Sequence, residues 1–330
     1  MRFRLLLTAS LALVASSAVA AELPITLPLG LQAQAAYVPN DNPLTKEKIA
    51  LGKQLFWDKR WSRNGTIACV SCHDPDHGWA DARRVSLRFD GTPTPRHSPT
   101  LVNRLFSDTQ QWAGTRASLE DQAIKASDQS PELLVKNLGA IAGYQRQFQK
   151  VFGTGVTPEG VAKAIAAYER TIVSGNSAYD RYRAGDAHAL TPAEKRGLAV
   201  FEGKGNCVRC HAGFNFTDES YHNLGVGMDK EKPDLGRYDV TKREEHRGAF
   251  KTPTLRDLTR RPPYFHDGSA ASLHDVIDVY DRGGVPNPWL SAEIKPLGFT
   301  PDERADLVRF LEVLTGEVAP EVTSAPTLPK

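Results

Sequence analysis

Two copies of one short motif hold all four cysteines of this 330-residue chain and constrain its fold more than any other feature. The motif is Cys-x-x-Cys-His, and the residues that define it are Cys69, Cys72 and His73 in the first copy and Cys207, Cys210 and His211 in the second. Two thiols at this spacing can add across the two vinyl groups of one porphyrin, and the histidine that follows can then ligate the iron. The motifs therefore predict two covalently bound haem c groups.

Other chemistry uses the same cysteine spacing. A bare Cys-x-x-Cys pair can be a redox dithiol, and two pairs can hold zinc or an iron–sulfur cluster. Histidine supplies only 9 of the 330 residues, so its occurrence after both pairs by accident has a chance of about one in a thousand. Haem is therefore the favoured interpretation, and no cysteine is left over to form a disulfide.

The N-terminus has the features of an export signal. Arg2 and Arg4 precede an apolar run over residues 5–14, and Ala18-Val19-Ala20 has the small-x-small pattern of a cleavage site. We therefore predict a signal peptide over residues 1–20 and a periplasmic protein, which suits haem attachment outside the cytosol. An uncleaved N-terminal anchor is the alternative. No later segment is a candidate to span a membrane.

The charge of the mature chain is close to balanced. The full chain has 41 Lys and Arg against 39 Asp and Glu, and removal of the two arginines in residues 1–20 leaves 39 of each sign. This balance gives no indication of nucleic acid or of an anionic membrane surface as a partner.

Helical patterns dominate the rest of the chain. Apolar residues recur at helical spacing after the candidate N-caps, which are Thr157, Thr191, Ser272 and Thr300. A similar helix end precedes each cysteine motif, over residues 52–56 and 197–201, and no sustained period-two pattern indicates a sheet. The sequence therefore predicts an all-α fold with long loops and two cytochrome c-like domains.

The domain boundaries follow from the spacing of these patterns. We expect an N-terminal domain over residues 21–180 and a C-terminal domain over residues 181–316, each with one haem. The polar segment over residues 177–186 is predicted to link them. Residues 317–330 contain three prolines and no periodicity, which predicts a tail that is disordered or lies along the surface.

Longer motifs surround the two cysteine motifs, from about Asn42 to Gly316. They are Arg96–Leu101, Gln111–Gly114, Phe216–Asp218, Tyr221–Gly225, Phe250–Arg256, Pro263–Gly268 and Tyr280–Gly284. Together they resemble the bacterial di-haem cytochrome c peroxidase family and, within it, the MauG-like branch. The resemblance covers nearly the whole mature chain.

This resemblance implies a division of labour between the haems. The N-terminal haem, with His73 as proximal ligand, would react with peroxide, and the C-terminal haem on His211 would take electrons from an external donor. Trp112 would relay electrons between them, although it could also be a core residue. Glu132 and Gln122 would lie beside the bound peroxide, where a carboxylate can accept and return a proton. Glu132 could instead be an ordinary first-turn helix acid.

One departure from the family concerns the peroxide-binding side of the first haem. Typical members have a histidine upstream of the Arg-Asn-Ser-Pro segment that caps this haem at rest. Here no histidine lies between Gly78 and Arg96, and spacing places Phe89 at that position. His77 is interpreted as a loop residue. We therefore predict a five-coordinate or water-bound N-terminal haem that needs no reductive activation.

A second departure concerns the sixth ligand of the C-terminal haem. Typical peroxidases use methionine, whereas Tyr280 occupies the matching position here, as in the MauG-like branch. Tyr280 also lies on the apolar face of its expected helix, where a core tyrosine would lie. Met228 is the alternative ligand, because the only other methionine is the initiator.

A third departure concerns calcium. The family places a calcium ion between the domains, held by an asparagine side chain and by two backbone carbonyls that correspond to Arg261 and Pro263. The asparagine position is His97 in this chain, and imidazole is a poor calcium ligand. The sequence therefore puts calcium binding in doubt.

Three functions are compatible with these motifs. The first is reduction of hydrogen peroxide with electrons from a small redox protein, either a c-type cytochrome or a cupredoxin. The second is MauG-like oxidation of a residue on a partner protein. The third is a non-enzymatic di-haem electron carrier, against which Glu132, Gln122 and the missing distal histidine argue. The chain is expected to be a monomer or a homodimer.

Overall fold

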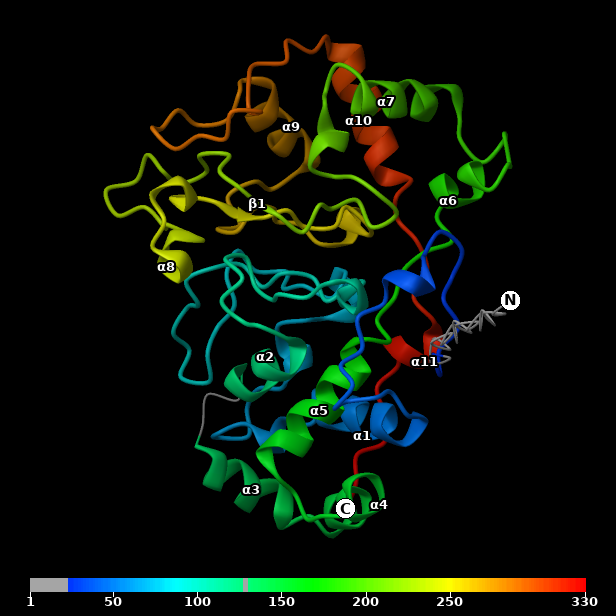
Figure 1. Ribbon diagram of the computed structural model, residues 1–330, viewed down its shortest axis with the longest axis vertical. Coiled ribbons are helices and arrows are strands. Elements are labelled where there is room, and N and C mark those ends of the chain that lie inside the picture. Colours follow the sequence, from blue (N-terminus) through cyan, green and yellow to red (C-terminus); the bar gives the residue numbers. More distant parts are fainter. Residues whose placement is uncertain (1–22, 127–129) are drawn as a thin grey trace, which may run out of the picture.

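The computed structural model describes residues 23–126 and 130–330, so the predicted signal peptide over residues 1–20 lies outside the described part. Two helical halves are stacked along the long axis of the molecule (Figure 1). The helices are α1 (Lys46–Trp57), α2 (Leu119–Ala126), α3 (Pro131–Gly139), α4 (Ala142–Phe152), α5 (Pro158–Glu169), α6 (Ala178–Arg183), α7 (Pro192–Glu202), α8 (Tyr238–Thr241), α9 (Leu273–Asp281), α10 (Pro301–Glu312) and α11 (Pro320–Thr323). Within the described residues, the sheet consists of β1 (Tyr221–His222) and β2 (Phe250–Lys251), paired antiparallel. The all-α fold predicted from the sequence is confirmed.

Short 3₁₀ turns connect many of these elements. They cover Ala33–Ala35, Lys59–Trp61, Cys69–Ser71, Pro75–His77, Arg104–Phe106, Cys207–Arg209, Glu244–His246 and Leu258–Arg260. The four predicted N-caps are confirmed, because the side chains of Thr157, Thr191, Ser272 and Thr300 each accept a hydrogen bond from a backbone amide of the first turn. Such a bond satisfies one of the amides that a helix leaves unpaired at its start.

Each half is built on one pair of packed helices, α1 with α5 and α7 with α10. The two pairs approach closely at a glycine. A Cβ on Gly52 would overlap the carbonyl oxygen of Ala164, and a Cβ on Gly197 would overlap that of Asp306. The α1–α5 pair and the α7–α10 pair therefore pack in the same way. Residues of α5 correspond to residues of α10 that lie a fixed number of positions later in the chain.

A second unit that follows each cysteine motif is also repeated. Residues 99–101 and 253–255 share the sequence Pro-Thr-Leu. Two residues later, Asn103 and Asp257 both have the left-handed backbone conformation, with φ of 60° and 54°. Their amides donate to carbonyls just beyond the ends of α5 and α10, those of Ile172 and Leu314. The segment after each cysteine motif therefore has the same sequence pattern, backbone conformation and hydrogen bond in both halves.

The helices α2 and α9 also correspond to each other, at the same separation in sequence as residues 99–101 and residues 253–255. Ser118 and Ser272 precede these helices, and each hydroxyl accepts the amide of an aspartate three residues later, Asp121 or Asp275. The second oxygen of each aspartate carboxylate accepts the amide of the alanine that precedes the serine. The two helices therefore begin in the same way, and their later residues can be compared position by position.

The segment that joins the halves and the tail are both ordered by contacts. The polar segment over residues 177–186 contains α6, and Asp180 within it is buried. The tail folds back against the N-terminal half, where Tyr168 donates to the carbonyl of Val322 (2.8 Å) and the amide of Gly143 donates to that of Lys330 (2.8 Å). Figure 1 shows the C-terminus beside α4, at the far end from α7 and α10.

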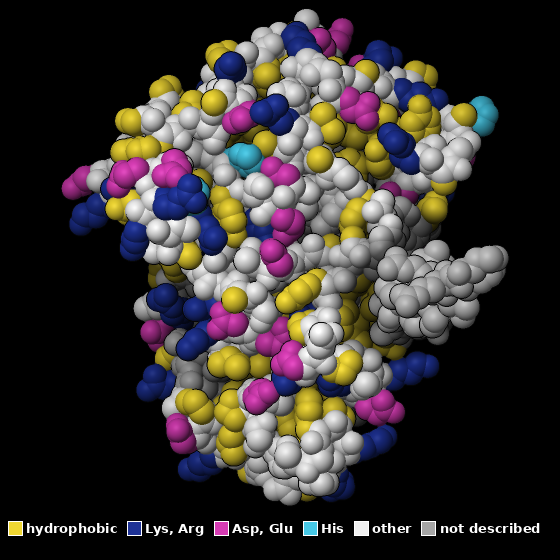
Figure 2. Space-filling model, viewed as in Figure 1, with side chains coloured by type: hydrophobic (Ala, Val, Ile, Leu, Met, Phe, Trp, Pro, Cys, Tyr) yellow, Lys and Arg dark blue, Asp and Glu magenta, His cyan; other side chains and the backbone are white. Residues whose placement is uncertain are grey.

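The surface carries both signs of charge. On the face shown in Figure 2, basic and acidic side chains are interspersed over both halves. Over residues 23–126 and 130–330, no helix has the length and the apolar character that crossing a membrane requires.

Candidate haem sites

The first cysteine motif forms a tight turn that orients its histidine. The amide of His73 donates to the carbonyl of Cys69 (3.0 Å), and Nδ1 of His73 lies 3.2 Å from the carbonyl oxygen of Trp79. When Nδ1 carries the proton, Nε2 is left with a free lone pair for a metal. Burial lowers the pKa of His73 to about 4, so the imidazole is neutral near pH 7, as an iron ligand must be.

The second motif has the same geometry. The amide of His211 donates to the carbonyl of Cys207 (2.9 Å), and Nδ1 of His211 lies 3.0 Å from the carbonyl oxygen of Phe216. Burial lowers the pKa of His211 to about 4 as well. Trp79 and Phe216, which supply the two carbonyls, both have positive φ, 61° and 52°. Each half therefore holds one neutral histidine with Nε2 available.

The donor set fits haem better than the alternatives. All four cysteines are free of disulfides. Burial raises the pKa of the Cys69 thiol well above its usual value and that of Cys207 to about 12, which disfavours the thiolate that a redox dithiol needs. Cys69 packs against the core of the N-terminal half and Cys207 against that of the C-terminal half. The two cysteine pairs therefore lie in different halves of the molecule, which excludes a single metal site built from both pairs.

Tyr280 lies close to the second motif. Burial raises the pKa of its phenol above the usual range, and the nearby sulfurs of Cys207 and Cys210 raise it further. The sulfur of Met228, the alternative ligand, lies beside Gly248, where a Cβ would contact it. The structure thus places Tyr280 near the second cysteine motif, and its role as a distal ligand stays a prediction.

The first site differs at the corresponding position. Because α2 and α9 begin at matching serines, the residue of α2 that corresponds to Tyr280 is Ala126. A methyl side chain has no atom that can ligate iron. Sequence comparison with the family did not identify this difference, because it becomes visible only when the two halves of the chain are compared with each other.

Trp112 lies at the junction of the two halves. Its indole Nε1 donates to the carbonyl of His97 (2.9 Å), and its own carbonyl accepts the amide of Lys251 in β2 (2.7 Å). The amide of His97 donates in turn to the carbonyl of His266 in the C-terminal half (2.8 Å). This position between the two motifs suits a relay, and the relay role stays a prediction.

Gln122 and Glu132 occupy different surroundings. The side chain of Gln122 on α2 accepts a hydrogen bond from Nε2 of Gln111 (2.8 Å), next to Trp112. Glu132 is exposed in the first turn of α3, and its own backbone amide and the Ser130 hydroxyl hold the pKa of its carboxyl below the usual range. The structure therefore connects Gln122 to the Trp112 region and gives Glu132 the contacts of a helix-start acid.

Phe89, at the position of the family's capping histidine, and the nearby His77 each contact another side chain. The guanidinium of Arg63 stacks over the ring of Phe89, 5.2 Å from its centroid. His77 forms part of the 3₁₀ turn Pro75–His77, and its Nδ1 lies 3.1 Å from a carboxylate oxygen of Asp74. The interpretation of His77 as a residue of the connecting segment agrees with this contact.

The residues at the predicted calcium position do not fit that ion. His97 is buried, and its Nδ1 lies 3.2 Å from the carbonyl oxygen of Arg83. Burial lowers the pKa of His97, and the positive charge of the buried Arg261 side chain lowers it further. A neutral imidazole beside a permanent cation is a poor environment for calcium, which prefers several oxygen ligands.

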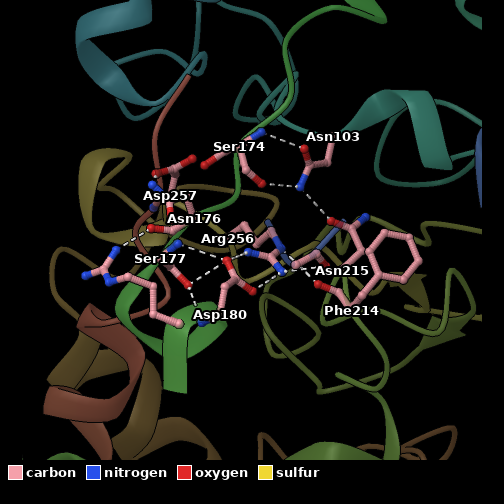
Figure 3. Close-up of polar contacts among 12 residues, drawn as sticks. Asn103, Ser174, Asn176, Ser177, Asp180, Phe214, Asn215, Arg256 and Asp257 are labelled. Atoms are coloured by element: carbon pink, nitrogen blue, oxygen red, sulfur yellow. Dashed lines mark hydrogen bonds and ion pairs between the residues drawn. The ribbon is translucent and has the colours of Figure 1, made fainter. Parts of the chain in front are cut away.

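A buried polar cluster fixes the second site relative to the first half (Figure 3). Nδ2 of Asn103 donates to Oδ1 of Asn215 (3.0 Å), directly before Phe216, whose carbonyl orients His211. Arg256 donates to the carbonyl of Phe214 (2.8 Å) on the other side of Asn215. The loop that supports His211 is therefore held by contacts from both halves.

Arg256 in this cluster is balanced by one carboxylate. Both side chains of the Arg256–Asp180 pair are almost fully buried, and two contacts of 2.8 Å join them. Asp180 also accepts the amide (2.9 Å) and the hydroxyl (2.8 Å) of Ser177. Sequence analysis missed this pair, since Asp180 lies in a segment whose polar composition predicted a linker.

We expect Asp180→Ala to destabilise the di-haem protein by about 3–5 kcal/mol, because it leaves the Arg256 charge buried without a partner. Asp239→Ala is the matched control, since Asp239 is 54% exposed in its ion pair with Lys242, and we expect it to change stability by about 0.5 kcal/mol at most. Denaturant unfolding followed by tryptophan fluorescence measures both. Equal midpoints for the two variants would show that the buried pair contributes little.

Comparison with known proteins agrees with the site geometry. A family model described as di-haem cytochrome c peroxidase matches residues 46–188. The methylamine utilization protein MauG of Methylorubrum extorquens is 42% identical over 301 residues, covering 88% of this chain and 84% of the relative. Cytochrome-c peroxidase IdrP1 of Pseudomonas sp. strain SCT is 38% identical, covering 88% and 86%. The crystal structure of a MauG-like protein associated with microbial copper homeostasis superposes with a TM-score of 0.82 at 33% identity, covering 88% and 96%.

Proposed function

Because the chain belongs to the di-haem cytochrome c peroxidase family, which includes MauG, we propose that it is a periplasmic enzyme that reduces hydrogen peroxide to water. A c-type cytochrome or a cupredoxin supplies the electrons. They enter at the second haem and are used at the first. Export rests on the signal peptide predicted over residues 1–20.

The difference between α2 and α9 carries this proposal. The helix α9 brings Tyr280 to the second motif, whereas α2 has Ala126 at the corresponding position. At the first motif His73 would hold the haem iron, and α2 offers no residue corresponding to Tyr280 as a second ligand, so peroxide or water could bind there. At the second motif His211 and Tyr280 would both hold the iron, which would suit electron transfer.

The haem bound at the first motif would supply the iron at which the oxygen–oxygen bond of peroxide is cleaved. The chain positions that iron through His73, which the carbonyl of Trp79 orients. Glu132 is proposed to take a proton from one peroxide oxygen and to return it to the leaving one. Its lowered pKa keeps it in the carboxylate form that accepts a proton. Gln122, held by Gln111, is proposed to offer a hydrogen bond nearby.

A MauG-like oxidation of a partner protein is the second candidate. A relative that carries the MauG name is 42% identical to this chain, and Tyr280 favours the same branch. A phenolate is an anionic ligand that stabilises ferric iron and lowers the reduction potential relative to methionine. Higher oxidation states then become easier to reach, and reduction by a high-potential cytochrome becomes less favourable.

Steady-state peroxide turnover by the purified di-haem protein tests the proposal, with a panel of reduced cytochromes and cupredoxins as donors. We expect saturable donor oxidation that depends on peroxide. Fast changes in the Soret band on adding peroxide, without donor turnover, would favour the MauG-like reaction instead. A slow Soret response would indicate that both irons are blocked, and the protein would then be an electron carrier.

A further inference from the structure

A carboxylic acid lies in the core of the N-terminal half. Glu169, the last residue of α5, is 5% exposed, and its Oε2 has no hydrogen-bond partner. Its charge raises the pKa of the Cys69 thiol, which places the carboxyl close to the sulfur that joins the first haem. A buried carboxyl oxygen without a hydrogen-bond partner is costly in a protein interior, so the presence of Glu169 needs an explanation.

In the C-terminal half, an apolar core residue occupies the position that corresponds to Glu169. Gly52 contacts Ala164 and Tyr168, and Gly197 contacts the corresponding residues of α10, Asp306 and Phe310. The residue after Tyr168 is Glu169, and the residue after Phe310 is Leu311, which belongs to the apolar core of the C-terminal half. The acid thus replaces a core leucine only in the half with the open haem site.

Charged groups surround Glu169 on several elements. The pKa of Glu169 is raised to about 8, chiefly by burial and also by the charge of Glu120, while Arg170 and Arg104 oppose the shift. Arg170 is paired with Glu120 (2.6 Å), and Arg104 donates to the side chain of Gln110 (2.8 Å). The titratable and charged groups that act on Glu169, or on which it acts, are Cys69, Arg104, Glu120, Tyr168 and Arg170. Glu169 is therefore protonated near pH 7 and can ionise within the physiological range.

We propose that Glu169 holds a proton whose binding is coupled to the redox state of the first haem. At a pH above the pKa of Glu169 in the oxidised protein, reduction adds one electron from the donor protein to the ferric haem, and the Glu169 carboxylate takes up one proton from solvent to become the neutral acid. Reoxidation reverses both changes. The reason is electrostatic, because a negative carboxylate in a medium of low dielectric opposes the added electron. The proposal rests on the assignment of the reactive haem to the first motif.

The test is a spectroelectrochemical titration of both haems in the wild-type di-haem protein and in Glu169→Gln, from about pH 6 to about pH 9, a range that spans the shifted pKa. We expect the wild-type potential of the first haem to fall by up to about 59 mV per pH unit, the value for one proton per electron. In Glu169→Gln this slope should disappear. The two proteins should agree at low pH, where Glu169 is neutral, and diverge as pH rises, with the variant higher.

Two controls separate this effect from a change in structure. Glu159→Gln removes an acid that is 73% exposed in the first turn of the same helix, and it should leave the slope unchanged. The second haem, with Leu311 at the corresponding position, should have the same potential in wild type and in Glu169→Gln. A difference between wild type and variant that is constant with pH, or equal slopes in both, would overturn the proposal.

A measurement on the unaltered protein covers the case in which Glu169→Gln does not fold. Recorded at about pH 9, above the pKa of Glu169 in the oxidised protein, the reduced-minus-oxidised infrared difference spectrum should contain a carboxylic acid carbonyl band that shifts in D₂O. Absence of that band would also overturn the proposal. Neither experiment uses peroxide, so failure here is distinguishable from failure of the peroxidase function.

Discussion

Replacement of Tyr280 by phenylalanine is expected to change the second haem from a low-spin, six-coordinate centre to a high-spin one and to raise its reduction potential. The phenolate is the negative ligand that favours ferric iron, and the positive charge of that iron offsets the burial that raises the pKa of the free phenol. Axial ligands tune haem potentials over roughly 0.8 V, so we expect a rise on the order of a tenth of a volt. Electron paramagnetic resonance and redox titration of the variant measure the two effects.

Two variants control for this result. Tyr182→Phe removes a phenol that packs against the core of the same half and should leave both haem spectra unchanged. Met228→Leu should also have no effect, since its sulfur lies beside Gly248. An unchanged low-spin spectrum in Tyr280→Phe together with a changed one in Met228→Leu would transfer the ligand role to Met228.

The sequence predicted the features that are encoded locally. The cysteine motifs fix the turns at His73 and His211, and the caps at Thr191 and Thr300 begin helices through contacts over three residues. These features need no knowledge of the rest of the chain, because each is complete within one short segment. The family resemblance then supplied the expected role of Tyr280.

The features that the sequence did not predict depend on partners far away in the chain. The polar sequence around Asp180 predicts a linker. Only the fold brings Arg256, 76 positions away in the chain, beside it. Val318 and Val322 lie in a proline-rich tail without periodicity, yet they pack against the N-terminal core. Glu169 resembles any helix-end acid until the comparison with Leu311 shows that its position is internal.

Trp112→Phe is expected to slow electron transfer from the second haem to the first. Trp112 spans the junction, because its indole Nε1 donates to the carbonyl of His97 and its backbone carbonyl accepts the amide of Lys251. Phenylalanine keeps an aromatic ring but shortens the conjugated system and loses the Nε1 donor. We expect the inter-haem rate to fall by about a hundredfold, equivalent to roughly 2.7 kcal/mol of barrier.

Stopped-flow reduction of the ferric protein by its donor resolves this effect from others. Reduction of the second haem should keep its wild-type rate in Trp112→Phe, and only the following phase at the first haem should slow. Trp289→Phe is the matched control, since that indole lies beside Arg247 in the C-terminal half, and both phases should remain unchanged. If the second phase of Trp112→Phe is as fast as in wild type with unaltered potentials, Trp112 is a packing residue of the junction and electrons pass between the haems by another path.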